Sequence, residues 1–131
     1  MVVYLDTSAI VKLVVREPES AALTAELEAF PERVASVVAD VEVARAVRRA
    51  SISARVTERM RRVVSRLGLI ELSPSVRQRA ASLGPISLRS LDAIHIATAL
   101  DLGDDLDAFI TYDERQAAAA RDAELEVSSP A

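Results

Sequence analysis

The stretch VVYLDTSAIVKL, residues 2–13, sets a short apolar run directly before the start of a helix. Residues 2–5 are continuously apolar and rich in β-branched side chains, which is typical of a strand buried in a parallel sheet. Asp6, Thr7 and Ser8 are residue types preferred at helix N-caps, and the apolar residues after them have helical spacing. The stretch therefore predicts a buried strand that ends at a carboxylate and turns straight into a helix.

The rest of the chain repeats this alternation of short apolar strands and helices. Such alternation predicts a parallel sheet with helices on both faces. We expect one domain over residues 1–131 of class α/β: a three-layer α/β/α sandwich with a mostly parallel sheet of four or five strands. The expected strands are residues 2–5, 34–37, 69–72 and 109–112, and a short fifth near 126–128. The expected later helices are residues 53–67, a helix capped by Ser87 that runs to about Leu102, and an Ala-rich helix from Glu114.

Composition limits the class of protein. Half of the 131 residues are apolar, so a core is available, and only 3% are aromatic. The chain has no cysteine, which excludes disulfides, thiolate metal sites and cysteine nucleophiles. Its apolar run at residues 9–15 is interrupted by Lys12 and falls far short of the ~20 residues that a membrane span needs. With no signal peptide visible either, we expect a cytoplasmic protein without a membrane partner.

The charge is unevenly distributed. The net charge of −4 argues against nucleic-acid binding by bulk attraction. Arginines nevertheless cluster in the middle of the chain, whereas acids crowd its last third. Four of these arginines follow one another at helical spacing on one face of the helix expected at residues 53–67. They are Arg55, Arg59, Arg62 and Arg66. This stripe is either a solvated helix face or a contact for the phosphates of a nucleic acid, and the sequence leaves both open.

Four acids occupy positions where a soluble domain seldom places them. Asp6 and Asp113 follow apolar strands, whereas Glu42 and Asp92 lie in apolar helical stretches. Sites in open α/β sheets form at the carboxyl ends of strands, so the first two acids lie close together if their strands are neighbours. Two carboxylates ~4 Å apart repel by roughly 4 kcal/mol at an effective dielectric of ~20. A divalent cation would reverse this repulsion, and an all-oxygen ligand set suits Mg²⁺ or Mn²⁺ better than Zn²⁺.

Each acid also has a simpler explanation. Asp6 and Asp113 can be helix N-caps, Asp92 a first-turn acid favoured by the helix dipole, and Glu42 a half-exposed helix residue. His95 is more readily a packed, hydrogen-bonded histidine than a metal ligand. The joint placement of the acids favours a site. Such a site takes phosphate oxygens as its remaining ligands, so phosphodiester hydrolysis is the natural reaction.

The segments that carry these acids resemble PIN-domain ribonucleases, specifically the VapC-type toxins of type II toxin–antitoxin systems. The matching segments are LDTSAIVKL, SVVADVEVARAV, LRSLDAIHIATA and FITYDER, which span residues 5–115. The resemblance implies an endoribonuclease that depends on Mg²⁺ or Mn²⁺. It implies that the acidic, metal-binding pocket consists of Asp6, Glu42, Asp92 and Asp113, supported by the hydroxyls of Ser8 and Thr111.

The resemblance also implies partners. These are an RNA substrate, a second copy of the chain in a homodimer, and a small antitoxin. The antitoxin is expected to bind DNA, to be encoded nearby, and to place its tail in the pocket or the groove beside it. One position departs from the family pattern. Many members carry a further acid two residues beyond Asp113, where this chain has Arg115. The departure bears on a second metal position and leaves the first unaffected.

Two other functions fit parts of the sequence. A catalytically silent PIN fold could bind RNA or a partner without cleaving, although its acids are intact. An Asp-nucleophile phosphotransferase or receiver domain also places an aspartate after its first strand. That class needs a second aspartate close by and a well-placed lysine. Here Ser8 stands where the second aspartate would be, and the sole lysine, Lys12, lies in the helix after Asp6. RNA cleavage that a chelator abolishes would separate the metal-dependent nuclease from both.

Overall fold

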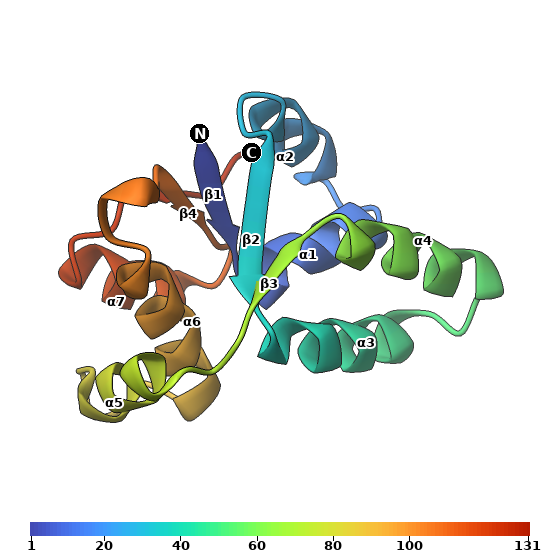
Figure 1. Cartoon of the computed structure of the whole chain (residues 1–131). Helices are drawn as coiled ribbons and strands as arrows, with labels where there is room; N and C mark the ends of the chain where they lie inside the picture. The colour runs from blue at the N-terminus through green and yellow to red at the C-terminus, as the bar shows by residue number, and fades with distance from the viewer.

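The computed structural model describes residues 1–131 and shows a five-stranded parallel sheet between two layers of helices (Figure 1). The order across the sheet is β3-β2-β1-β4-β5, and every neighbouring pair is parallel. In chain order the strands are β1 (Val2–Leu5), β2 (Glu32–Ser36), β3 (Gly68–Ile70), β4 (Ala108–Ile110) and β5 (Val127–Ser128). The predicted α/β class and its parallel sheet are confirmed.

One face of the sheet carries the first four helices, and the other carries the last three. The first group is α1 (Thr7–Val14), α2 (Ser20–Leu27), α3 (Val38–Ala50) and α4 (Ala54–Ser65). The second is α5 (Pro74–Ser82), α6 (Ser90–Asp101) and α7 (Glu114–Asp122), with a 3₁₀ turn at Gly103–Asp105. In Figure 1, α3 and α4 extend beyond the sheet as a helical hairpin. None of the helices combines the length and apolar character that a membrane crossing requires.

The strand β1 separates two cores because its side chains alternate. Val3 and Leu5 pack into the core under α1 to α3, whereas Tyr4 points to the opposite face. There the Tyr4 ring stacks on Phe109 of β4 with ring centroids 5.2 Å apart. Full burial of a side chain of this size contributes about 1.5–3 kcal/mol to folding. Leu5 is therefore anchored in one core and Tyr4 in the other, which holds the end of β1 before Asp6 from both faces of the sheet.

The start of α6 differs from the prediction. The helix begins at Ser90, with Arg89 at the N-cap, and Ser87 is exposed and does not cap it. The reason lies in the preceding turn, where the N–H of Leu88 donates to the carbonyl of Pro85. This turn includes Ser87 and Leu88, which would have been the N-cap and the first residue of the predicted helix. Asp92 consequently lies at the third position of α6, in the turn where backbone N–H groups are free.

The chain order of the strands creates a divergence point beside β1. After β1 the chain moves outward to β2 and β3, and it then returns to the other side of β1 for β4. In open α/β sheets, binding sites form beyond the carboxyl ends of the strands at such a point. Asp6 follows β1 directly, and Thr111 follows β4. The fold thus places these two residues at the position where a site is expected.

Candidate active site

The four predicted acids line one cavity of about 430 Å³ at the carboxyl ends of β1 and β4. Two of them follow strands, and the other two come from α3 and α6, which belong to opposite helix layers. They are Asp6, Glu42, Asp92 and Asp113. The structure therefore brings together residues that are far apart in the sequence. The same cavity is also lined by Thr7, Ser8, Val11, Lys12, Glu17, Ala46, His95 and Tyr112.

Asp6 is the most enclosed of the four acids, with 4% of its surface exposed. Its Oδ1 accepts hydrogen bonds from the Ser8 hydroxyl at 2.6 Å and from the N–H of Ala9 at 3.1 Å. Its Oδ2 accepts the hydroxyl of Thr111. Burial raises the pKa of Asp6, and the hydrogen bonds from Ser8 and Thr111 oppose that rise. Asp6 is thus the N-cap of α1 and a wall of the cavity at the same time.

The register between β1 and β4 decides how differently Asp6 and Asp113 are buried. Leu5 is opposite Ile110, so the next residues along, Asp6 and Thr111, are neighbours across the two strands. Asp113 follows two residues later, beyond the end of the sheet, and is exposed. Thr111 thereby occupies the place beside Asp6 that a second acid would otherwise share. This register places the Thr111 hydroxyl, a hydrogen-bond donor, beside Asp6, where the carboxylate of Asp113 would repel it.

Asp113 caps α7 with one oxygen and leaves the other free. Its Oδ1 accepts the N–H groups of Arg115 at 2.9 Å and Gln116 at 3.1 Å. The loop that carries it is tied to α1, because the N–H of Tyr112 donates to the Ser8 hydroxyl at 2.8 Å. The capping role and the place in the cavity again coexist in one side chain.

Glu42 is held by a hydrogen-bond chain that runs through the core. Its Oε1 accepts the Thr7 hydroxyl at 2.9 Å and the Nε2 of His95 at 2.7 Å. The other imidazole nitrogen, Nδ1, is 2.6 Å from the Tyr4 hydroxyl, which accepts the N–H of Ser36 at 2.9 Å. Because a carboxylate only accepts, Nε2–H is the donor to Glu42, and in the neutral imidazole Nδ1 then accepts the Tyr4 phenol. These hydrogen bonds orient both the imidazole ring and the Glu42 carboxylate.

This hydrogen-bond chain also determines the charge of Glu42. Burial acts to raise the pKa of Glu42, but the hydrogen bond and charge interaction with His95, together with the Thr7 hydroxyl, outweigh it. The pKa of Glu42 is therefore lowered. Burial raises the pKa of Tyr4, which keeps its phenol protonated and able to donate. The sequence indicated that His95 is packed and hydrogen-bonded, but it gave no sign that Glu42 is its partner.

Negative charge accumulates around Asp92. This half-buried residue forms no hydrogen bond through its side chain. Burial raises the pKa of Asp92, as do the charges of Asp113, Asp6 and Glu42, while His95 opposes them. The one cation on the cavity wall is Lys12. Lys12 neutralises the four acids poorly, because its ammonium group is already paired with two other glutamates.

Lys12 is paired with two glutamates that follow α1. Its Nζ lies 2.8 Å from Glu19 and 3.4 Å from Glu17, and 4.8 Å from the centre of the Tyr112 ring. These contacts balance its charge locally. The acids of the cavity therefore have no free internal counter-ion.

The donor chemistry of the cavity suits a hard cation, although no closed cage exists. The Asp92 carboxylate and the second oxygen of Asp113 accept no hydrogen bond, and the atoms that the acids offer to a metal are all carboxylate oxygens. No three acidic or histidine side chains lie close enough together to hold a metal ion by themselves. Mg²⁺ characteristically takes one or two carboxylates and completes its shell with water and phosphate oxygens. The residues fit that open mode of binding.

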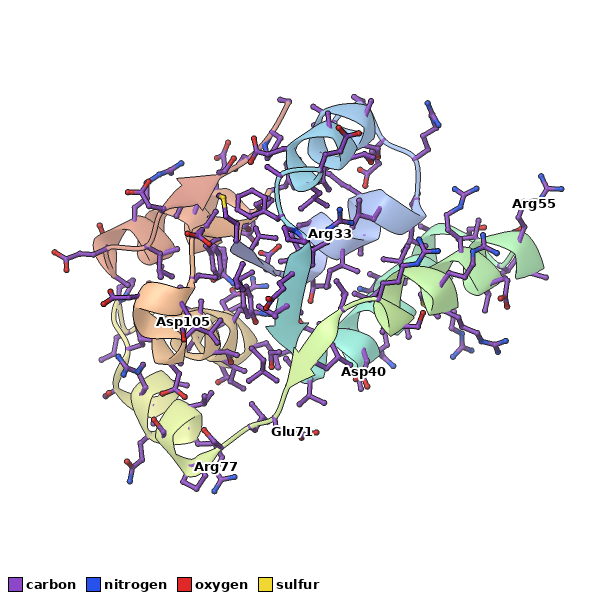
Figure 2. All side chains as sticks on the ribbon, turned by 45° about the horizontal axis from the view of Figure 1, so that its top comes forward. Arg33, Asp40, Arg55, Glu71, Arg77 and Asp105 are labelled. Carbon is purple, nitrogen blue, oxygen red and sulfur yellow. The ribbon has the colours of Figure 1, made fainter.

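The arginine stripe does not reach this cavity. None of its four members lines the cavity, and Figure 2 shows Arg55 at the outer end of α4. Arg59 instead donates to the carbonyl of Val14 at 3.3 Å, which ties α4 to the end of α1. One of the four arginines thus has a structural role, and an RNA contact by the stripe stays a prediction.

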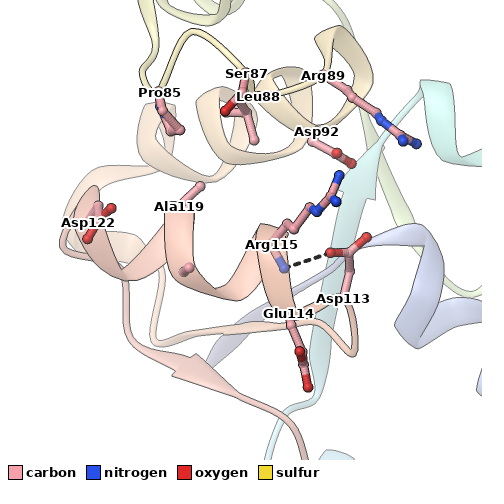
Figure 3. A pocket seen from close by; sticks show the side chains of 11 residues that line it. Pro85, Ser87, Leu88, Arg89, Asp92, Asp113, Glu114, Arg115, Ala119 and Asp122 are labelled. Carbon is pink, nitrogen blue, oxygen red and sulfur yellow. Dashed lines mark hydrogen bonds between the residues drawn. The ribbon is translucent and has the colours of Figure 1, made fainter.

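A second, larger cavity of about 880 Å³ adjoins the first and shares Asp92 and Asp113 with it (Figure 3). It lies between the segment before α6 and the outer side of α7. Two arginines line it, Arg89 and Arg115. Sequence reasoning missed Arg89, although its place three residues before Asp92 on the same short segment was a usable signal. Arg115 was noticed only as a missing acid.

Comparisons with known proteins identify the family and the fold. The profile of the PIN domain matches residues 3–122. Ribonuclease VapC46 of Mycobacterium tuberculosis (strain ATCC 25618 / H37Rv) is 46% identical over 128 residues, covering 98% of this chain and 97% of its own. A crystal structure of VapBC2 from Rickettsia felis bound to a promoter DNA fragment aligns over all of both chains, with a TM-score of 0.77 and 16% identity. A toxin–antitoxin complex from Klebsiella pneumoniae aligns over 98% of both chains with a TM-score of 0.73 and 24% identity. The two structural likenesses establish the fold.

Proposed function

The chain belongs to the PIN-domain family, and from this membership we propose that it is an endoribonuclease toxin that hydrolyses RNA phosphodiester bonds with Mg²⁺ or Mn²⁺. The observation that carries the proposal is the convergence of four acids on one cavity at the divergence point of the sheet. A relative that is 46% identical over nearly the whole chain is named a ribonuclease, which supports the same reaction class.

The residues of the cavity divide the work. Asp6, Asp92 and Asp113 would hold the cation, because Asp6 is oriented by hydroxyls and the other two have oxygens free. A bound divalent cation supplies positive charge for the phosphate and lowers the pKa of water. Glu42 is ionised and oriented by His95, so it can accept a hydrogen bond and then a proton from the attacking water, or add a ligand.

We extend the proposal to the protein's partners. Two of the similar folds come from complexes, one of them a toxin–antitoxin complex, which supports an antitoxin that binds this chain as well. An anionic cavity of this kind suits an arginine or lysine from the tail of such a partner, because the cation would replace the charge of the metal. A groove of about 400 Å³ between α1, α2 and α4 offers a second place of contact. A homodimer is part of the same proposal.

The deciding experiment is cleavage of RNA by the purified chain. We expect activity with Mg²⁺ or Mn²⁺ and none in EDTA. Asp6→Asn should remove a ligand charge and reduce cleavage by about 100-fold or more while the protein remains folded. Asp40→Asn is the matched control, because Asp40 is an exposed acid in the first turn of α3 that does not line the cavity.

Three results would contradict the proposal. Full activity in EDTA would remove the metal from the reaction. Equal activity of folded Asp6→Asn and Asp40→Asn would move the chemistry to another place. RNA binding without cleavage in any divalent metal would favour the silent binding module. For the toxin role, expression of the wild type should arrest growth, and Asp92→Asn should not.

A further inference from the structure

The larger cavity described above is a cleft with two different walls. Apolar side chains of the segment before α6 and of α7 form one part, namely Pro85, Leu88, Ala118 and Ala119. Asp92 and Asp113, which the cleft shares with the acidic cavity, form another part together with Arg89 and Arg115. Two further acids, Glu114 and Asp122, also line the cleft. Its volume of about 880 Å³ lies in the range of sites that bind small molecules, about 300–1,000 Å³. The cleft therefore has room for a nucleotide.

The two arginines of the cleft are free to bind an anion. Arg89 is the N-cap residue of α6, and Arg115 is the second residue of α7. In Figure 3 the Arg115 side chain extends between Asp92 and Asp113, and Arg89 reaches out on the other side of Asp92. Neither guanidinium takes part in an ion pair, in contrast to Lys12. Their hydrogen-bond donors are thus open to solvent at the border of the two cavities.

The two arginines can attract a phosphate that the acids of the cavity repel. A phosphate that approaches the acidic cavity meets the charges of Asp6, Glu42, Asp92 and Asp113, and the nearest lysine is already paired. An arginine binds phosphate with two parallel hydrogen bonds and keeps its charge at any physiological pH. Arg89 also stands where α6 begins, and because no side chain caps this helix, its first backbone N–H groups add to the positive potential.

We propose that the cleft is a nucleotide-binding subsite for the RNA strand next to the scissile bond. Arg89 and Arg115 bind the phosphate that follows the scissile one, and the apolar wall at Leu88 and Ala118 receives the base. The proposal rests on the ribonuclease function above and adds to it the residues that place the RNA. It assigns the role to this arginine pair and not to the stripe on α4.

The first experiment measures RNA binding. Arg89→Gln and Arg115→Gln are combined with Asp6→Asn, which prevents cleavage, and are titrated with a fluorescent single-stranded RNA pool of random sequence. Each should weaken binding about five- to tenfold. Each should also make the negative slope of log affinity against log salt concentration shallower by about 0.7. Arg121→Gln is the matched control, because Arg121 is exposed on the same α7 but does not line the cleft.

The second experiment measures the base subsite. Ala118 is exposed on the wall of the cleft, so Ala118→Phe fills the cleft without altering an acid or an arginine. Sequencing of the cleavage ends should show that the wild type prefers certain bases beside the cut, and that Ala118→Phe changes this preference. Ala81→Phe, at an exposed position on α5, should leave it unchanged.

The outcomes separate this proposal from the function on which it rests. A wild type that does not cleave RNA refutes the function, whatever the arginine variants do. A wild type that cleaves, with Arg89→Gln and Arg115→Gln binding RNA as tightly as Arg121→Gln, refutes the subsite alone. An unchanged base preference in Ala118→Phe refutes the base-binding wall. Loss of antitoxin binding in the arginine variants with RNA affinity intact would make the cleft a protein contact and would overturn the proposal.

Discussion

Asp6 and Glu42 line the same cavity, yet the protein holds them in opposite ways. Asp6 is enclosed by two hydroxyls and a backbone N–H, and burial raises its pKa. Glu42 is bound to an imidazole and a hydroxyl, and its pKa is lowered. Neighbouring groups with pKa values pushed apart are typical of sites in which carboxylates have different roles. The surroundings of Glu42 favour its ionised form, whereas the burial of Asp6 opposes ionisation, which an added cation would favour.

The two environments depend on different parts of the fold. The Asp6 environment depends on the register of β1 against β4, which sets Thr111 beside it. The Glu42 environment depends on α3 and α6 meeting across the end of the sheet, with Tyr4 below them as the second partner of His95. The contrast can be tested by breaking each environment separately.

The largest effect is expected from His95. His95→Leu removes the donor to Glu42 and the acceptor of the Tyr4 phenol, which is fully buried. We expect a loss of about 2 kcal/mol in the free energy of unfolding. We also expect kcat to fall at least about tenfold with little change in KM, because Glu42 is no longer oriented.

Two further variants separate orientation from stability at the same position. His95→Gln places an amide near Nε2 and keeps a donor for Glu42, whereas His95→Asn reaches only the Nδ1 position beside Tyr4. His95→Gln should therefore recover more of kcat than His95→Asn at similar thermal stability. If activity per folded molecule is equal in all three variants, His95 is structural only, and the contrast between the two environments has no catalytic meaning.

Thr111→Val tests the Asp6 environment with a smaller change. It replaces a hydroxyl by a methyl group and leaves Oδ2 of the buried Asp6 without its donor. Unfolding should become easier by about 1.5 kcal/mol, as measured by urea denaturation. Thr98→Val is the comparison variant, because Thr98 is equally buried and its hydroxyl contacts the carbonyl of Ile94 and the Tyr4 phenol, but no acid. If both variants lose the same free energy of unfolding, the hydrogen bond from Thr111 to Asp6 has no special importance.

The smallest effect is the dependence of stability on pH in EDTA, and its sign differs between the two acids. The raised pKa of Asp6 means that the folded state binds the proton more tightly, so this stabilisation is lost as pH rises above about 4. The lowered pKa of Glu42 gives stability that is present above about pH 4.3 and lost as pH falls through the folded-state pKa. Thermal melts should show a flatter slope between pH 4 and 7 in Asp6→Asn and a smaller acid loss in Glu42→Gln. A wild-type slope in Asp6→Asn would contradict this assignment.

The sequence predicted one environment better than the other for a physical reason. Asp6 and Asp113 follow apolar strands, and the rule that parallel strands end at one edge places them close together once the two strands are neighbours, as β1 and β4 are. The contact of Glu42 with His95 joins residues on two helices from opposite layers, and no local periodicity encodes how such helices meet. The β1–β4 register, which exposes Asp113, likewise depends on pairing between distant segments.

The start of α6 shows the same limit on a local scale. Ser87 has the chemistry of an N-cap, but the turn between Pro85 and Leu88 takes precedence and moves the helix start to Ser90. The shift also places Arg89 at the cap position next to the acids. A prediction from residue preference alone could not foresee which of two competing local hydrogen-bond patterns would form.

The central position of β1 has a consequence for protein synthesis. The middle strand of the finished sheet, β1, is synthesised before the strands on either side of it, and the adjacent Asp6 accepts a hydrogen bond from Thr111, 105 residues further along the chain. Domains generally fold as units during synthesis. A nascent chain that contains β1, β2 and β3 but not yet Asp113 therefore has no complete site. We expect that such a ribosome-bound fragment is no nuclease, so the messenger and ribosome that produce the protein meet an assembled site only in completed molecules.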